Sequence, residues 1–371
     1  MKSRRVNLLI ITPHRVGGLG SLVEAMQELC IEDRRLNCTV VDLSVRRTNV
    51  LYTYINDLLV SIRLLLKGGF HVIMYLGGVP YVGGIIAKLK RIPVIVFVNG
   101  YVIHEAISYI RGALSELDVR RLIDGIIYLI FYHLGRFVAD LFIFPCYGTL
   151  ENNKIPRSKP KVVIPLWLSK TRLRWIERIK CEIEERKERQ DFLVVVYLSN
   201  VKSPKVMRSD QVVRILDLIY KRSGNKIKAI LIDPKGTLNI KKDFMLVYRH
   251  MSWEEFIKLL ARSDLYIEPV LDDEFRYSTL EAMALGIPVV KITTLNYCER
   301  MDLRYQLTTC SFNEFLFKIL DYIKNKENYL KDCKDIVTKY VYEHRTWEMA
   351  RRKLLPVLLT LARKHEVRSR I

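Results

Sequence analysis

The strongest constraint on the fold is a rhythm of short, continuously apolar runs that alternate with longer amphipathic stretches. In the first half of the chain, β-branched and aromatic residues dominate the runs at 6–12, 38–44, 71–76, 93–99 and 141–145, which we expect to be strands. The stretches between them repeat apolar residues at helical spacing. Runs without polar alternation fit strands that are covered on both faces. The pattern predicts βαβ units around a parallel sheet.

The same rhythm starts again in the second half of the chain. Further strands are expected at 191–199, 227–233, 244–249, 264–270 and 287–293. Between the halves, residues 170–190 alternate charged residues with helix formers, which is typical of a solvated helix or hinge.

The length of 371 residues also exceeds the usual span of one hydrophobic core. We therefore expect the α/β class, with two Rossmann-like doubly wound domains at 1–169 and 191–340 that face a cleft. Ligands of such sheets bind at the carboxyl ends of the strands, so the cleft is the expected active site.

The formal net charge is +21, which attracts anionic partners. Nucleic acid, an anionic membrane face and phosphate-bearing small substrates all fit this charge, and charge alone does not choose among them. The seven cysteines are scattered and never spaced as C-x-x-C, so neither a zinc site nor a disulfide framework is predicted. We expect a reducing, cytoplasmic location.

Two apolar segments mimic targeting or membrane signals. Residues 68–87 carry no Asp, Glu, Lys or Arg, but they hold six glycines, a proline and a histidine, which suit a lipid-exposed helix poorly. We interpret them as a buried strand, a glycine-rich loop and the start of a helix. The run at 6–12 follows a basic start but is short and ends in Pro-His-Arg, so we interpret it as a strand rather than a signal peptide.

The most informative segment is IEPVLDDEFRYSTLEAMALGIPVV at 267–290. A strand leads into an acidic loop, after which Ser278, Thr279 and Glu281 open a helix that Gly286 and Pro288 close. Because a helix N-terminus presents unpaired N–H groups and a positive dipole end, this one could hold a diphosphate.

This segment resembles the donor-site motif of the retaining GT-B glycosyltransferases of family 4. In that motif, seven residues separate two acids, and A-M-A-x-G-x-P-V-V follows the second. Asp273 and Glu281 have this spacing, with Asp in place of the usual Glu, while Glu274 and Arg276 stand where the family commonly has glycine. The resemblance implies that Asp273 contacts the donor sugar and Glu281 the ribose. It also implies phosphate contacts from the backbone of Phe275, Arg276, Tyr277, Ser278 and Thr279.

A second resemblance lies at YLSNVKSPKV, residues 197–206. The family carries a Gly-Arg pair here and a lysine five residues after the arginine, and the two cations neutralise the leaving diphosphate. Lys205 matches the lysine, but Ser199 and Asn200 replace the pair. The missing cation is expected from Lys202 or Arg208, with solvated surface side chains as the alternative reading.

The first domain resembles the family more diffusely. Gly17 and Gly18 follow the first strand and would let a backbone approach the donor before the next helix begins. Asn99 stands where such enzymes often have a histidine near the transferred sugar, and His104 or His14 could serve instead. The segment HRTWEMARRKLL resembles the family's closing helix, so residues 341–371 are expected to return to the first domain.

The resemblance implies glycosyl transfer from a nucleotide sugar to an acceptor hydroxyl, with retention of configuration, no metal and no cofactor. Asp273, Lys205, Asn99 and His104 are the candidate catalytic residues, and Asp272 and Asp273 do not form a convincing metal pair. The transition state resembles an oxocarbenium ion beside a departing nucleoside diphosphate, which fixed cations and amides would stabilise.

The acceptor side is less specific. Three segments of the first domain mix cationic and aromatic residues with apolar faces: RLLLKGG, KLKR and YIRGALSELDVRRLIDGIIYLIFYHLGRF. Such stretches can lie on an anionic membrane, which favours a glycan or lipid-linked acceptor and attachment to the inner membrane face. An equally good explanation is that these stretches are helices buried in the domain, with Lys and Arg side chains that reach solvent.

Two rival functions remain. A GT-B relative could epimerise a nucleotide sugar instead of transferring it. A basic nucleic-acid-binding protein would also explain the charge, but no module signature is present and the basic residues are spread along the chain, so no nucleic acid is expected.

Overall fold

The computed structural model of the chain consists of two compact units. Residues Met1–Ser169 and Trp347–Ile371 form the first unit, and residues Lys170–Thr346 form the second. The structure describes residues 5–13, 17–43, 50–77, 82–98, 100, 102–184, 192–198, 207, 209–234, 236, 238–268, 276–292, 308–309 and 311–369.

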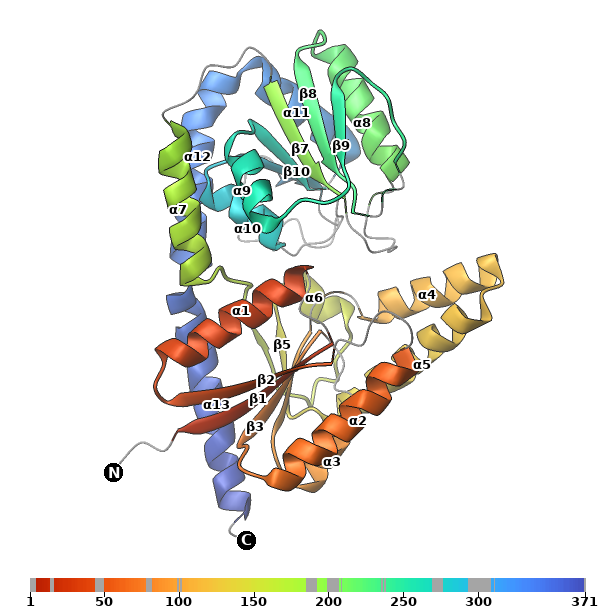
Figure 1. Cartoon of the computed structure of the whole chain (residues 1–371), viewed down its shortest axis with the longest axis vertical. Helices are drawn as coiled ribbons and strands as arrows, with labels where there is room; N and C mark the ends of the chain where they lie inside the picture. Colours follow the sequence, from red (N-terminus) through yellow and green to blue (C-terminus); the bar gives the residue numbers. More distant parts are fainter. Residues whose placement is uncertain are drawn as a thin grey trace. The chain divides into compact units, whose positions relative to one another are not determined.

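The first unit is built on a parallel sheet of six strands in the order β2-β1-β3-β4-β5-β6 (Figure 1). Its strands are β1 (Val6–Thr12), β2 (Leu36–Asp42), β3 (Val72–Leu76), β4 (Val94–Phe97), β5 (Leu141–Phe144) and β6 (Lys161–Val163). The direction of winding reverses between β1 and β3, as in flavodoxin-like sheets. The strands are almost wholly buried at the centre of the sheet, which explains their continuous apolar sequences.

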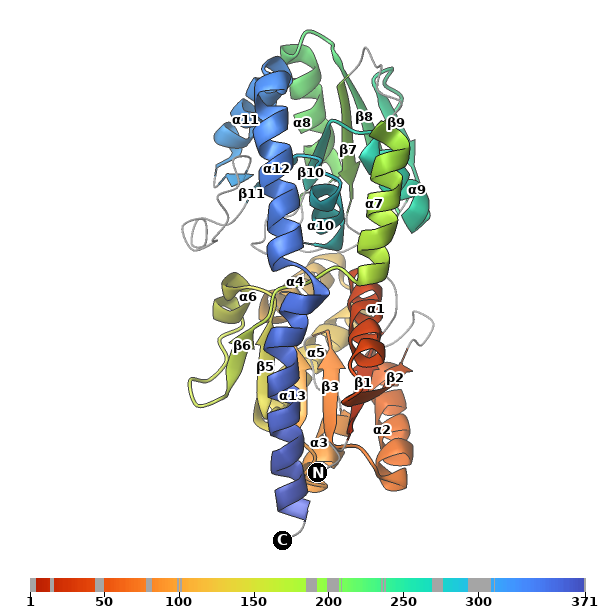
Figure 2. The same ribbon diagram turned by 90° about the vertical axis from the view of Figure 1, so that its left-hand side faces the viewer.

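Helices cover both faces of this sheet. Helices α1 (Gly17–Glu32) and α13 (Trp347–Ser369) contact each other on one face. On the other face lie α2 (Val50–Lys67), α3 (Val82–Leu89) and α5 (Val119–Val138), which contact one another (Figures 1 and 2). Helix α4 (Val102–Glu116) pairs with α5 as a hairpin, and the short α6 (Tyr147–Asn152) follows β5.

A buried carboxylate fastens α13 to the turn before β2. Asp33 accepts two hydrogen bonds from the Arg35 guanidinium, at 2.9 and 2.8 Å, and a third from Arg351 Nε at 2.8 Å. These hydrogen bonds, those of Arg35 first, hold the pKa of Asp33 below its usual value.

The second unit has its own six-stranded parallel sheet, in the order β12-β11-β10-β7-β8-β9. Its strands are β7 (Phe192–Tyr197), β8 (Ile227–Ile232), β9 (Met245–Tyr248), β10 (Leu265–Glu268), β11 (Val289–Ile292) and β12 (Thr308–Thr309). Numbered within the unit, this is the 3-2-1-4-5-6 order of the dinucleotide-binding fold, with the reversal between β7 and β10.

The helices of the second unit lie on both faces of its sheet. Because crossovers between parallel strands are right-handed, α8 (Ser209–Arg222) lies on one face, and α9 (Trp253–Ala261) and α10 (Tyr277–Ala284) lie on the other. Helix α11 (Phe312–Lys324) contacts α8, while α7 (Lys170–Glu184) and α12 (Lys326–His344) contact α10.

The predicted fold class is confirmed: both halves of the chain are doubly wound, Rossmann-like α/β units with parallel sheets. The expected absence of disulfides is wrong, because Cys30 and Cys38 form one. Cys30 lies in the last turns of α1 and Cys38 in β2, and the short turn between these elements brings their Cα atoms to 5.9 Å. A separation of eight residues matches none of the spacings that signal a site.

Candidate functional site

The topology of the second sheet brings the two candidate donor segments to one place. Strands β7 and β10 are hydrogen-bonded neighbours, with Val196 in register with Ile267, and the winding reverses between them. The segment with Asn200, Lys202 and Lys205 follows β7, and the segment with Asp273 and Phe275 follows β10. Both therefore start at the carboxyl edge of the switch point, where open α/β sheets bind ligands. These five residues and Arg208 lie outside the described residues.

Helix α10 begins directly behind this edge. Its N-cap is Arg276, an extended residue (φ −76°, ψ 164°) whose side chain makes no capping hydrogen bond. Tyr277 and Thr279 are buried, whereas Ser278 and Arg276 are half-buried. The side chains of Tyr277 and Thr279 therefore face the interior, and what this turn can offer a ligand is chiefly its backbone N–H groups and its dipole.

A buried carboxylate connects the end of β10 to the start of α10. Glu268, the last residue of β10, accepts a hydrogen bond from Thr279 Oγ1 at 2.6 Å. Arg276 Nε lies 4.0 Å from its other oxygen. Burial raises the pKa of the Tyr266 hydroxyl, and the negative charge of the nearby Glu268 raises it further. Sequence reasoning missed Glu268, although an acid at the carboxyl end of a predicted buried strand was a usable signal.

Lys291 is a second missed residue at this edge. It is fully buried in β11 and is the register partner of Glu268. Partners in adjacent parallel strands project from the same face of the sheet. A buried carboxyl group and a buried lysine thus lie on adjacent strands at this edge.

Glu281, predicted to bind the ribose, is held in an aromatic and cationic cluster. Its Oε1 accepts a hydrogen bond from Trp253 Nε1 at 2.7 Å and forms an ion pair with Arg172. The Arg172 guanidinium lies 4.7 Å above the Trp253 ring, which in turn packs against Trp175 with ring centroids 4.9 Å apart. The carboxylate is thereby fixed in one orientation. The sequence offered no signal for Arg172 or Trp253 as its partners.

The first unit has glycine-bearing turns at the same edge of its sheet. Gly77, after β3, has φ +105°, and a Cβ there would stand 3.4 Å from Leu19 and 3.5 Å from Pro13. Gly77 therefore packs closely against Pro13, at the end of β1, and Leu19 in α1. Gly17 and Gly18 were expected to precede the helix; instead α1 begins at Gly17, so both lie in its first turn, where glycine leaves the backbone accessible.

The turn after β4 is organised by a buried amide that sequence reasoning missed. Asn153 donates to Gly100 O at 2.9 Å and accepts from Val102 N at 3.0 Å. It thereby fixes the left-handed Gly100 (φ +96°) and caps the start of α4. His104 is the third residue of this helix, whereas Asn99 and His14 lie outside the described residues.

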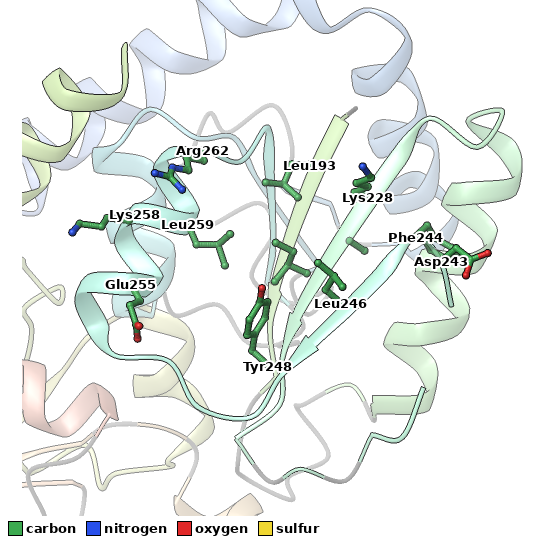
Figure 3. A pocket seen from close by; sticks show the side chains of 12 residues that line it. Leu193, Lys228, Asp243, Phe244, Leu246, Tyr248, Glu255, Lys258, Leu259 and Arg262 are labelled. Atoms are coloured by element: carbon green, nitrogen blue, oxygen red, sulfur yellow. The ribbon is translucent and has the colours of Figure 1, made fainter. Parts of the chain in front are cut away.

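A hollow of about 570 Å³ opens elsewhere in the second unit, between α9 and strands β7 to β9 (Figure 3). Leu246, Tyr248 and Leu259 line it, and it includes none of the predicted site residues. Among the residues that the structure describes, no group of three or more His, Cys, Asp or Glu side chains could hold a metal ion.

No protein-family model matches the chain, and no curated protein sequence matches it. Solved structures do match it over nearly its full length. Sucrose-phosphate synthase from Thermosynechococcus elongatus is 11% identical, with a TM-score of 0.66, and the match covers 96% of this chain and 99% of that one.

Two further matches have lower TM-scores. The UDP-GlcNAc 2-epimerase from Neisseria meningitidis, solved with UDP-GlcNAc, has a TM-score of 0.57 at 12% identity and covers 95% and 100% of the two chains. A ugt transferase from Siraitia grosvenorii, solved with UDP, has a TM-score of 0.56 at 11% identity and the same coverage. The chain therefore has the GT-B fold, which glycosyltransferases and nucleotide-sugar epimerases share.

Proposed function

We propose that the chain is a glycosyltransferase that moves a sugar from a nucleoside diphosphate donor to an acceptor hydroxyl. One observation carries the proposal: the two segments that resemble a donor site follow β7 and β10, the strands between which the second sheet reverses. Because β7 and β10 are parallel neighbours, segments 69 residues apart, from Asn200 to Pro269, follow the same ligand-binding edge of the sheet and can contribute to one site.

In this proposal the diphosphate binds at the first turn of α10. Lys205 and Arg276, with Lys202 or Arg208, neutralise the charge that develops on the leaving phosphate, and fixed N–H groups do the same without reorganisation. Asp273 holds the sugar hydroxyls, and Glu281, oriented by Arg172 and Trp253, receives the ribose. Fixed charges suffice for this step, so no metal is invoked.

The first unit is proposed to contribute further residues to donor binding. Gly17 and Gly18 would approach the donor, and Asn99 or His104 would lie near the reacting carbon. The reaction is proposed to retain the anomeric configuration, which NMR of the product would report. Inversion at the anomeric carbon would contradict that part of the proposal.

A panel of nucleotide sugars, screened for thermal stabilisation and for transfer to acceptors, tests the proposal. Loss of a charge-assisted contact costs about 1.5 to 3 kcal/mol, so Lys205→Ala should weaken donor binding by about 10 to 100-fold. The exposed Lys241 offers a matched control, and Lys241→Ala should leave binding unchanged. Equal binding by both variants would remove Lys205 from the site.

A nucleotide-sugar epimerase is the second candidate, because the same fold is found in the Neisseria meningitidis enzyme. Incubation with a donor and no acceptor separates the two. Accumulation of an altered free nucleotide sugar, with no transfer to any acceptor, would favour epimerisation over transfer.

A further inference from the structure

Helix α2 exposes an apolar stripe on the outside of the first unit. Ile55, Leu59, Ile62 and Leu66 are all exposed, and their spacing of four, three and four residues places them on one side of the helix. The opposite side of the helix is buried against the unit, through Asp57, Ser61 and Leu65. Helix α2 therefore presents large apolar side chains to solvent on the side that faces away from the unit.

Helix α5 repeats this feature over its full length. Val119, Ile123, Ile126, Ile130, Leu134 and Phe137 are exposed at spacings of three and four residues, and Phe137 is 76% exposed. The inward side is also apolar, with Gly125, Tyr132 and Gly135 buried. Apolar side chains that gather on one exposed side of a helix normally mark a surface that binds a partner or a membrane.

The exposed stripes belong to well-packed helices. A Cβ at Gly125 would come within 2.8 Å of Ile110 Cγ1, so α5 and α4 touch almost backbone to backbone. Helix α2 contacts α5, and both lie on the side of the sheet opposite α1 and α13 (Figures 1 and 2). At the turn of the α4–α5 hairpin, Leu117 is 89% exposed. We call the ten exposed residues of α2 and α5 the apolar face.

Charge indicates what covers the apolar face. Arg63 and Lys67 flank the stripe of α2, Arg120 flanks that of α5, and all three are exposed. The only acid in α2 is Asp57, which is fully buried, and the only acid in α5 is Asp124. Apolar stripes flanked by cations, with few acids, are typical of helices that lie in an anionic membrane interface.

We propose that the apolar face binds an anionic lipid bilayer, with α2 and α5 lying in its interface. A second copy of the chain fits less well, because two chains of charge +21 repel each other, whereas anionic lipid attracts them. Among the described helices, none is long and apolar enough to cross a membrane. Resting on the proposed function, lipid binding places a lipid-linked acceptor within reach of the unit expected to bind acceptors.

Flotation of the full chain with vesicles tests the proposal. Vesicles of phosphatidylcholine with about a third phosphatidylglycerol should carry the protein, whereas phosphatidylcholine alone should carry at least tenfold less. The double variant Leu59→Glu/Ile130→Glu should lose at least tenfold in binding to the anionic vesicles. The matched control Ile31→Glu changes an exposed residue of α1, on the opposite side of the same unit, and should bind as the parent does.

The nucleotide-sugar stabilisation assay on the same variants separates this proposal from the proposed function. The double variant should keep the donor-induced shift of the parent, which also shows that it is folded. Equal loss of vesicle binding in Ile31→Glu, or binding that ignores lipid charge, would overturn the proposal. The proposal would also be overturned if the parent chain formed a dimer that did not bind the vesicles. In that case Leu59→Glu/Ile130→Glu would dissociate the dimer.

Discussion

Thr279, in the first turn of α10, donates its hydroxyl hydrogen to the buried carboxylate of Glu268 at the end of β10, over 2.6 Å. This bond sets where the helix starts relative to the strand edge. The position of the α10 N–H groups, and hence of any diphosphate they hold, depends on it.

Removing that hydroxyl should therefore lower both stability and donor affinity. Thr279→Val keeps the shape but removes a hydrogen bond to a buried carboxylate, at a cost of about 1 to 3 kcal/mol in the free energy of unfolding. Denaturant unfolding measures this cost. Thr338→Val is the control, because Thr338 makes only a 3.4 Å bond to Met283 O, and it should cost clearly less. Equal losses in the free energy of unfolding for the two variants would show that the Thr279–Glu268 hydrogen bond does not contribute more to stability than the Thr338 bond.

The ion pair of Arg172 with Glu281 should be strongly coupled. Arg172→Met keeps the aliphatic contact with Trp253 but removes the Arg172 charge from the buried carboxylate of Glu281, which costs on the order of 3 kcal/mol. Adding Glu281→Gln to Arg172→Met should recover part of this loss, and a double-mutant cycle gives the coupling energy. Additive effects of the two substitutions would contradict the cluster as described.

Asp57 should give the first unit an unusual dependence on pH. Burial raises its pKa to about 6 from 3.8, against hydrogen bonds from Gly83 N (2.6 Å) and Ser61. A raised acid pKa means that the folded state keeps a proton that the unfolded state has lost, so stability falls as pH rises from about 4 to 6. The fall is on the order of 3 kcal/mol, and Asp57→Asn should abolish it. A parent-to-variant difference that is constant with pH would contradict this account.

Asp33 should make stability depend on pH in the opposite direction from Asp57. Its pKa is lowered by Arg35 and Arg351, so the stability it contributes is present above its ordinary value of 3.8 and is lost as pH falls below it. Arg351→Gln should lower the thermal midpoint and reduce this acid-induced loss, because α13 loses its tie to Asp33. Its exposed neighbour Arg352 provides the control Arg352→Gln, which should change neither.

The fold followed from the sequence where burial on both faces leaves a clear mark. The runs that became β1, β7 and β8 are apolar at nearly every position because most of their residues are buried on both faces of the sheet. The strands β6 and β12 were not predicted, since two or three residues at a sheet edge leave no such pattern. The Cys30–Cys38 disulfide was missed because its geometry depends on the turn between α1 and β2.

The candidate site was predictable only in part. The helix expected to open at Ser278 begins at Tyr277, so its start was predictable to within one residue from local signals. The partners of Glu281 were not, since Arg172 lies 109 residues away and reaches it only through the packing of α7. Asn153 was equally hidden, because it organises the turn at Gly100 from a distance of 53 residues.

A crystal structure of the chain with a bound nucleoside diphosphate tests the central claim most directly. The expected result places the phosphate oxygens about 3 Å from the backbone nitrogens at the first turn of α10, with Glu281 beside the ribose. A diphosphate bound in the hollow between α9 and β9, or any other site with the first turn of α10 left unbound, would contradict it.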